Sequence, residues 1–350
     1  MGIRDIMDTS RIRWIKSTGP ENDIVVSSRV RLARNLKGIP FPHILPDSGD
    51  KEVIKKVYEA FTLSTALSRD AELYTMQSLT DGQKKLLAEM HLISPDMAGL
   101  NKGAVLVSGD QTISIMINEE DHLRIQTVFP GLQIVEAYNM ASKVDDVLEE
   151  KLDYAFDEQL GYLTACPTNV GTGIRASVMM HLPVLTMTDQ IGQIFSTISQ
   201  LGLVVRGFHG EGTQVKGNLY QISNQITLGK SEEDIIQNVT SVVRQLITSE
   251  RKMRKGLSQE AFTRLEDKVF RSYGVITNAK LLSSQEAIQC ISDVRLGLEL
   301  GIIKDLKLED INGLFISTGP AYIHEFSGEA LSPLDRDLRR AQFIRTILKK

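Results

Sequence analysis

The sequence predicts an α+β protein whose first part is a largely antiparallel sheet flanked by helices and whose last part is an all-α domain. Three observations support this prediction. Short β-rich runs and amphipathic helical segments share residues 23–256. Residues 104–118 hold two β-rich runs around a Ser-Gly-Asp-Gln turn, which is typical of an antiparallel hairpin. Beyond Gly256 the strand signals nearly vanish and helical periodicity takes over.

These elements divide the chain into a lead-in (1–22), an α+β domain (23–256) and a helical domain (257–350). Strands are expected at 23–36, twice within 104–118, just after 118, and on both sides of a glycine-rich loop within 201–229. Helices of the α+β domain are expected at 51–68, 81–90, 143–160, 188–201 and 231–255, the last beginning at a capping box of Ser231 and Asp234. Helices of the last domain are expected at 259–273, 284–300, 308–314 and 335–349.

The composition narrows the class of protein. A chain of 350 residues with 42% hydrophobic residues can form two domains with substantial cores. Its formal net charge of −4 argues against a general nucleic-acid binder. Only two cysteines, Cys166 and Cys290, are present, which is too few for a disulfide framework and fits a reducing cytoplasm. No apolar run approaches the roughly 18 residues of a membrane span, so no membrane association is expected.

Several familiar motifs are incomplete. Leu228–Ser231 reads LGKS like the end of a P-loop, but Asn224 stands where that motif needs its first glycine. Gly171–Gly173 reads GTG and lacks the third glycine of a dinucleotide fingerprint. The two cysteines do not have the spacing of a zinc site. The sequence therefore favours none of these sites, and no protein-held metal is predicted.

Arginines mark the first strand. In SSRVRLAR, Arg29 and Arg31 are two residues apart, so both side chains lie on one face of a strand. Two neighbouring guanidinium groups repel unless an anion lies between them, and arginine matches phosphate oxygens in a bidentate way. A polyphosphate clamp is the functional interpretation. A solvated edge strand is the alternative.

Three further segments carry charged or reactive side chains near turns. NEEDHLR places Glu120 and Arg124 after an apolar strand, RGFHGEGTQ places Arg206 and Glu211 in a glycine-rich loop, and CPTNVGTGIRASV places Cys166 before Arg175. Taken alone, each fits a charged loop, a long hairpin loop or a structural cysteine. Together, the arginines suit the phosphates of ATP with Mg²⁺, and the two carboxylates and the thiolate suit a planar guanidinium acceptor.

These four segments, in this order and spacing over residues 20–255, resemble the ATP:guanido phosphotransferases, the phosphagen kinase family. Within that family the chain looks most like the bacterial protein-arginine kinases of the McsB type. Metabolic members carry a helical N-terminal domain of about 100 residues, whereas about 20 residues precede the motifs here, which implies a site open to a protein substrate. The second loop reads GEGTQ where metabolic members usually read Gly-Glu-His-Thr-Glu.

The resemblance also implies roles for individual residues. Glu120 matches the first substrate carboxylate and base, Glu211 the second carboxylate, and Cys166 the reactive cysteine beside the guanidinium. The positions that match nucleotide contacts are Ser28, Arg29, Arg31, His91, Arg124, Arg175 and Arg206. The match at His91 rests on a diverged local sequence, and a solvated or capping histidine is the alternative there.

The C-terminal extension contains RDLRRA, which resembles the motif that recognises phosphoarginine in the bacterial branch. On a helix, Arg336 and Arg340 share one face and could hold a phosphoryl group, while Asp337 accepts from the guanidinium part. A charged helix face is the alternative. The extension is also expected to mediate self-association, giving a homodimer.

The expected function is that of a protein-arginine kinase that uses ATP and Mg²⁺, the metal being carried by the nucleotide. The resemblance implies cytoplasmic partners: substrate proteins with exposed arginines, a zinc-containing activator, a Clp-type chaperone-protease and a heat-shock repressor, in a stress response with allosteric control. Three alternatives are open: a free-guanidino phosphagen kinase, an inactive phosphoarginine-binding adaptor, and an ATP-grasping ligase-like enzyme, for which no glycine loop matches.

Overall fold

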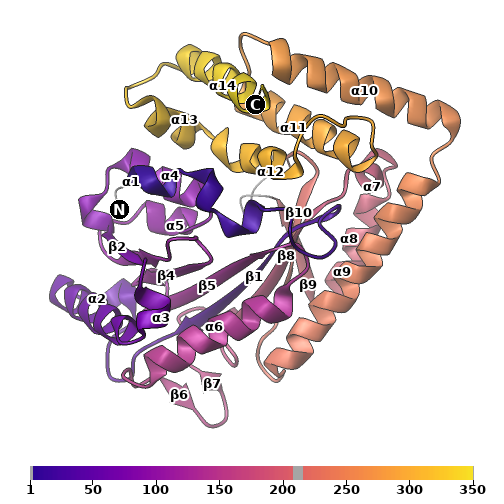
Figure 1. Ribbon diagram of the computed structural model, residues 1–350. Coiled ribbons are helices and arrows are strands. Elements are labelled where there is room, and N and C mark those ends of the chain that lie inside the picture. Colours follow the sequence, from indigo (N-terminus) through magenta and orange to yellow (C-terminus); the bar gives the residue numbers. More distant parts are fainter. Residues whose placement is uncertain (1–2, 208–215, 350) are drawn as a thin grey trace.

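The computed structural model describes residues 3–207 and 216–349, and it confirms the α+β class with a helical C-terminal part. Within these residues, eight strands form one antiparallel sheet in the order β2-β3-β4-β5-β1-β8-β10-β9 (Figure 1). The strands are β1 (Val25–Arg34), β2 (Glu72–Thr75), β3 (Ala104–Val107), β4 (Ile113–Ile117), β5 (Leu123–Pro130), β8 (Ile174–His181), β9 (Leu203–Gly207) and β10 (Leu219–Asn224).

One face of the sheet is covered by helices and forms the larger apolar core. The alternation of β1 sends Val30 and Leu32 into this core, at 0% and 1% exposure, so that Arg29 and Arg31 point to the opposite face. The helices that build the core against the sheet are α2 (Asp47–Thr62), α6 (Ile134–Glu149), α7 (Pro183–Met187), α8 (Ile191–Gln200) and α9 (Glu232–Lys255).

A second core joins the other face of the sheet to the N-terminal segment and the C-terminal helices. Trp14, Val26, Val128 and Leu314 are buried together in it. Figure 1 shows the C-terminal helices stacked at one end of the sheet. The shorter helices of the N-terminal half are α1 (Ile3–Ile6), α3 (Thr65–Ser68), α4 (Asp81–Glu89) and α5 (Pro95–Ala98). The C-terminal helices are α10 (Gln259–Asn278), α11 (Ser284–Glu299), α12 (Leu308–Ser317), α13 (Pro320–Ser327) and α14 (Pro333–Leu348).

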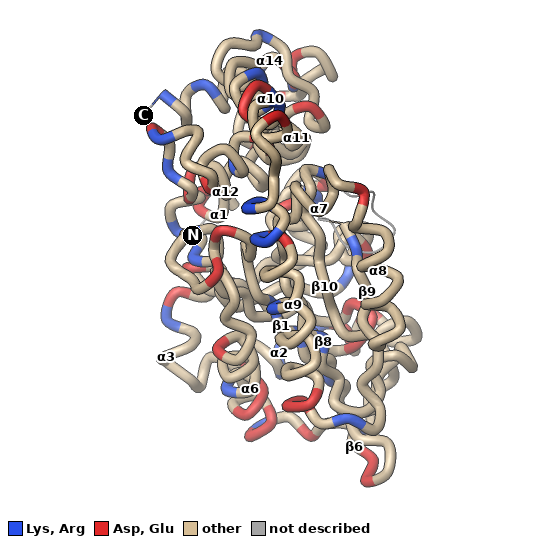
Figure 2. Tube along the Cα trace, turned by 90° about the vertical axis from the view of Figure 1, so that its right-hand side faces the viewer, with Lys and Arg blue, Asp and Glu red and all other residues tan. Residues whose placement is uncertain are grey.

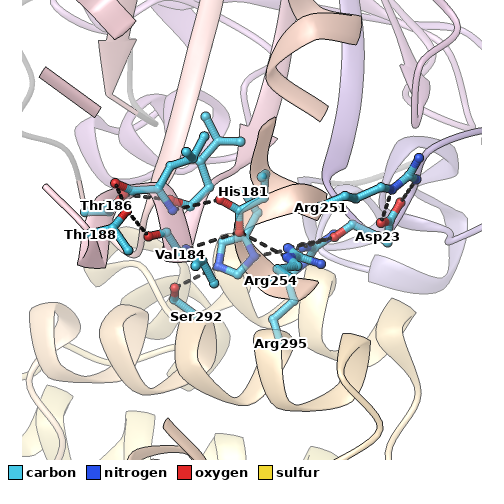
Figure 3. Close-up of polar contacts among 12 residues, drawn as sticks. Asp23, His181, Val184, Thr186, Thr188, Arg251, Arg254, Ser292 and Arg295 are labelled. Atoms are coloured by element: carbon cyan, nitrogen blue, oxygen red, sulfur yellow. Dashed lines mark hydrogen bonds and ion pairs between the residues drawn. The ribbon is translucent and has the colours of Figure 1, made fainter. Parts of the chain in front are cut away.

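A buried polar network ties the C-terminal helices to the sheet (Figure 3). Arg295 of α11 is fully buried and donates to the carbonyls of Asn22 and Asp23 at 2.7 and 3.3 Å, and to His181 Nδ1 at 2.9 Å. His181 Nε2 in turn lies 2.8 Å from the hydroxyl of Ser292. Burial, reinforced by the charge of Arg295, keeps the pKa of His181 well below its usual value, so the ring is neutral and can accept from Arg295.

The structure corrects parts of the predicted element boundaries. The helix expected at 143–160 is instead α6, which begins at Ile134 because its first turns bury Ala137 and Ala141 under the sheet. After Glu149 the chain turns so that Tyr154 can pair with Leu36, just beyond β1, and a short hairpin of β6 (Phe156–Asp157) and β7 (Gly161–Tyr162) follows. The sequence interpretation also omitted β2, the strand character of β8, and α13. No helix among the described residues is long and apolar enough to cross a membrane.

Replacing the buried arginine of the domain junction should destabilise the protein. Arg295→Ala leaves two carbonyls and a histidine nitrogen without their donor, so we expect a loss of about 3 kcal/mol in the free energy of unfolding. Denaturant unfolding measures this loss. Arg271→Ala is the matched control, because Arg271 is 77% exposed and pairs only within its own helix with Asp267, where an effect near zero is expected. Equal stability of both variants would contradict the assigned role of Arg295.

Candidate active site

A pocket of about 540 Å³ opens on the sheet face that α6 and α9 leave uncovered. Its floor is formed by β1, β5, β8, β9 and β10, and its walls by residues 88–100 and the loop 166–173. It brings together eight of the residues expected at the site: Arg29, Arg31, His91, Glu120, Arg124, Cys166, Arg175 and Arg206. Motifs that are more than 100 residues apart in sequence thus line one cavity.

The five arginines of this pocket come from four strands, and strand register places them side by side. Arg31 of β1 lies opposite Arg175 of β8, and Arg206 of β9 lies opposite Gln221 of β10. Gln221 reaches across the sheet and accepts from Arg29 at 2.7 Å. Like charges directly opposite each other on a sheet are destabilising. The arginines therefore concentrate positive charge on one face of the sheet, and a bound anion would relieve their repulsion. In Figure 2, Lys and Arg positions lie near the β1 and β8 labels.

The electrostatics of Arg29 and Arg31 show the strength of this charge. Burial, followed by the charges of Arg124, Arg175 and Arg206, lowers the pKa of Arg29 to about 10. Burial and the neighbouring arginines also lower the pKa of Arg31 well below its usual value. Among the described residues, the buried Nε of Arg31 has no hydrogen-bond acceptor. A donor set of this kind fits the oxygens of a polyphosphate, which accept several guanidinium hydrogen bonds at once.

Acidic residues hold Arg124 at the pocket wall. The Arg124 guanidinium lies 2.7 Å from Glu119 Oε2 and 2.9 Å from Glu120 Oε2, and its side chain is 14% exposed. Glu119 is nearly buried at 3% exposure and also accepts from the hydroxyl of Ser94, which begins α5. Sequence reasoning missed Glu119, Ser94 and Gln221. Glu119 could have been identified, because it stands next to Glu120 in the same motif.

Glu120 and Cys166 form the other end of the pocket. The Glu120 side chain is 42% exposed. Desolvation raises the pKa of Glu120, and the neighbouring carboxylates of Asp121 and Glu119 add to the rise, while Arg124 and a hydrogen bond with Cys166 oppose it. The Cys166 sulfur lies 3.0 Å from the hydroxyl of Thr168. A carboxylate with a raised pKa beside a thiol is suited to accept a proton from a bound cation.

A buried hydrogen-bond junction fixes Glu120 relative to Cys166. Asp121, at 1% exposure, accepts at one oxygen from Asn35 Nδ2 at 2.6 Å and from the backbone N–H of Ala165 at 2.7 Å. Asn35 accepts in return from the backbone N–H of His122 at 2.9 Å. The residues on either side of this junction, Glu120 and Cys166, are thereby held by groups that do not themselves line the pocket.

Glycine in the loop 171–173 serves close packing. A Cβ on Gly173 would lie 2.6 Å from the carbonyl oxygen of Ala33, and its φ of +66° disfavours other residues. Arg34 anchors the same loop, donating to the carbonyl of Thr172 at 3.0 Å while its Nη2 lies 2.6 Å from Asp145 of α6. The loop is thus fastened to both β1 and α6, which fixes the start of β8 and with it Arg175.

Two of the predicted nucleotide residues have local partners. Ser28 lies outside the pocket: it is fully buried, and its hydroxyl donates to the carbonyl of Gly131 at 2.8 Å and accepts from Gln133 N–H at 3.0 Å. His91 does line the pocket, has a left-handed φ of 61°, and stacks edge-on with Trp14 at 6.0 Å.

Glu211 lies outside the described residues. No group of three or more His, Cys, Asp or Glu within 3–207 and 216–349 is arranged to hold a metal ion.

The RDLRRA residues lie on α14, away from this pocket. Arg340 is only 2% exposed, and its guanidinium donates to the carbonyls of Thr318 and Leu282 at 2.7 Å each and to Asp337. The guanidinium of Arg340 is therefore largely engaged in hydrogen bonds within the protein. The side chain of Arg336 is half-buried and more accessible to a ligand. Both arginines act electrostatically on Glu89, the last residue of α4, which accepts from two backbone N–H groups at the start of α13.

Comparison with known protein families agrees with this geometry. The model of the ATP:guanido phosphotransferase C-terminal catalytic domain matches residues 52–253. The model of the protein-arginine kinase McsB C-terminal domain matches residues 262–350.

Curated relatives resemble the chain over its whole length. The protein-arginine kinase of Bacillus licheniformis is 50% identical, covering 100% of this chain and 96% of the relative. That of Bacillus subtilis is 49% identical, covering 99% and 95%. Among solved structures, lombricine kinase is 26% identical with a TM-score of 0.60, covering 72% of each chain. The duplicated taurocyamine kinase of Schistosoma mansoni with bound transition state analog components is 26% identical with a TM-score of 0.58, covering 74% of this chain and 38% of that one.

Removing one arginine from the pocket should stabilise the empty protein while weakening its hold on phosphates. The lowered pKa of Arg31 means that its charge costs folding free energy at neutral pH, and that this cost falls only when the pH rises above the depressed pKa and ends above the ordinary arginine pKa. We therefore expect Arg31→Gln to raise the thermal midpoint in the absence of ligand and to lose most of the further rise that inorganic triphosphate gives the parent protein. Arg244→Gln, on the exposed side of α9, is the control and should change neither value. A lower midpoint with an unchanged triphosphate effect would contradict the assignment.

Proposed function

This chain belongs to the ATP:guanido phosphotransferase family and to its protein-arginine kinase branch, and we propose that it transfers the γ-phosphoryl group of ATP to arginine side chains of proteins. The observation that carries the proposal is the single pocket in which five arginines meet Glu120 and Cys166. The reaction needs one binding site for a polyphosphate and one for a guanidinium. We assign the polyphosphate to the arginines, and the guanidinium to the end of the pocket formed by Glu120 and Cys166.

The arginines hold the nucleotide. Arg29, Arg31 and Arg175 lie together on β1 and β8 and bind the phosphates, while Arg124 and Arg206 close the cluster from β5 and β9. Their fixed positive charge stabilises the negative charge that spreads over the transferring group. Mg²⁺ bound to the phosphates neutralises further charge and orients the γ-phosphoryl group. His91 faces the same pocket, and we assign it to the nucleotide.

The acceptor guanidinium binds at Glu120 and Cys166. A terminal nitrogen attacks the γ-phosphorus, the bond to the bridging oxygen of ATP breaks, and ADP leaves with the electron pair. The guanidinium is a weak nucleophile until it gives up a proton, which Glu120 accepts as the P–N bond forms. Cys166 contacts the guanidinium beside Glu120, and Glu211, by the resemblance, holds it from the second loop.

The acceptor is an arginine of a protein chain. Relatives named protein-arginine kinase match from end to end at about half identity, which supports this assignment over a free-guanidino substrate. The acceptor end of the pocket also lies at the surface, where Glu120 is 42% exposed and the following loop residues Pro167 and Thr168 are exposed. An inactive adaptor is disfavoured by the five arginines, Glu120 and Cys166 that line the pocket.

A second site for phosphoarginine lies on α14. Arg336 donates to the phosphoryl group of phosphoarginine, and Asp337 accepts from the guanidinium of the same ligand. Arg340 donates to Asp337 and so holds that carboxylate in place. Glu89 provides a physical route between the two sites, because it caps α13 beside Arg336 and follows Ala88, which lines the catalytic pocket. Binding of an anion here competes with the Glu89 carboxylate, and this is the allosteric control that we assign to the domain.

The biological setting follows from the resemblance. We assign the chain to the cytoplasm as a homodimer with a catalytic domain at 23–256 and a helical domain at 257–350, after a lead-in of 22 residues. Its products mark proteins for a Clp-type chaperone-protease in the stress response. A zinc-containing activator and a heat-shock repressor are its other partners.

Phosphotransfer from labelled ATP with Mg²⁺ tests the proposed function. We expect an acid-labile label on an unfolded arginine-rich protein and none on free arginine, because a P–N bond is labile in acid. Glu120→Gln should lower kcat by about 10²–10³-fold, as loss of a general base does, while ATP binding persists. In the parent protein the rate should fall as the pH drops through the raised pKa of Glu120, since only the ionised carboxylate accepts a proton. Label on free arginine alone would identify a metabolic phosphagen kinase instead.

Phosphoarginine binding tests the second site. Arg336→Ala should weaken binding of free phosphoarginine by about tenfold or more in calorimetry, since a charge-assisted bidentate contact is lost. Arg339→Ala is the matched control, because Arg339 is its 51% exposed neighbour on the same helix. Arg340→Ala is a poorer test, because its loss also removes three hydrogen bonds of the fold. Equal binding by both variants would place the site elsewhere.

A further inference from the structure

A shallow apolar groove lies beside the β6–β7 hairpin and has no part in the chemistry described above. It measures about 260 Å³. Three of its large apolar side chains are unusually exposed: Phe156 at 57%, Leu160 at 47% and Leu228 at 50%. Exposed apolar side chains gathered in one hollow are typical of a surface that binds another molecule.

The groove is built on the same loop that begins at Cys166. Tyr162 N–H donates to the carbonyl of Gly171 at 2.8 Å, and the Thr227 hydroxyl donates to the carbonyl of Val170 at 2.7 Å. The backbones approach so closely that a Cβ on Gly161 would lie 2.5 Å from Gly171 O. One wall of the groove and the acceptor end of the catalytic pocket are therefore parts of one continuous, packed loop.

The length of this loop limits the distance between the two sites. Gly171 lies five positions after Cys166, so their Cα atoms are at most about 18 Å apart even in a fully extended chain. A turn at Pro167–Asn169 shortens the path further. A polypeptide whose arginine reaches Cys166 can therefore place in the groove a side chain that lies within about five residues of that arginine.

Charge and position also favour a segment of the substrate. Asp157 and Glu158 are exposed at the tip of the hairpin, where Figure 2 shows acidic positions, and they attract a basic, arginine-bearing chain. Figure 1 places β6 and β7 at the opposite end of the molecule from the C-terminal helices, so these helices leave the groove open.

We propose that this groove binds an apolar side chain of the substrate protein that lies within about five residues of the target arginine, so that the enzyme selects arginines near exposed hydrophobic residues. This inference rests on the proposed function and adds a substrate class to it. Apolar side chains are exposed next to arginine mainly in unfolded chains, because folded proteins bury most of them. The groove thus makes the enzyme prefer unfolded protein.

Peptides with a single arginine test the groove. In a Ser/Gly background, phenylalanine is placed in turn at each of the five positions on either side of the arginine, and kcat/KM is measured by acid-labile label. At one or more positions we expect a rise of about tenfold over the peptide without phenylalanine. Phe156→Ser should abolish this rise and leave the rate for the background peptide unchanged. Phe270→Ser is the matched control, since Phe270 is 51% exposed on α10, and it should keep the rise.

Fluorescence anisotropy of the same labelled peptides, without ATP, separates the two hypotheses. Phenylalanine-dependent binding that is lost in Phe156→Ser, without any phosphotransfer, would support the groove and refute the proposed function. Phosphotransfer that is indifferent to phenylalanine, or a preference that survives Phe156→Ser, would refute the groove alone. A change of oligomeric state in Phe156→Ser with an unchanged peptide preference would show a contact between copies of this chain and would also overturn the proposal.

Discussion

Electrostatic repulsion among buried arginines is the constraint on which the rest of this structure depends. Arg29 and Arg31 lie beside Arg175 on one face of the sheet, and their pKa values are lowered by burial and by the charges of neighbouring arginines. Such an arrangement destabilises a protein that has no anion to bind. The fold tolerates it because the opposite face of the same strands is largely apolar and packs under α6 and α9, with Arg34 paired to Asp145. The apolar packing on one face thus offsets the repulsion among the arginines on the other, and we propose that these arginines bind the phosphates of ATP.

The end of the pocket formed by Glu120 and Cys166 depends on a different interaction, which is positioning by buried hydrogen bonds to a carboxylate. Asp121 and Asn35 do not line the pocket, yet they connect the loop of Glu120 to the loop of Cys166 through bonds of 2.6 and 2.7 Å. Loops joined in this way move as one unit, which is what an in-line transfer between two bound groups requires. The same loop continues into the wall of the apolar groove, so the proposed acceptor site and the proposed groove for substrate side chains share one loop.

The sequence predicted the residues that line the pocket better than it predicted where the helices begin and end. Period-two spacing placed Arg29 and Arg31 on one face correctly, because alternation is a local property of a strand. The helix expected at 143–160 was wrong, since its true start at Ile134 depends on burial against a sheet that local periodicity does not reveal. The two arginines of RDLRRA share a helix as expected, but only tertiary contacts show that Arg340 is used by carbonyls of the fold. Gln221 was missed because its contact with Arg29 joins residues that lie 192 positions apart in the sequence.

The most direct test is a crystal structure with a non-hydrolysable ATP analogue, Mg²⁺ and an arginine peptide. The account predicts phosphate oxygens in contact with Arg29, Arg31 and Arg175, and the peptide guanidinium between the γ-phosphoryl group and the carboxylate of Glu120. Nucleotide bound elsewhere, or a guanidinium remote from Glu120 and Cys166, would contradict the claim that the arginine face and the acceptor end form one active site.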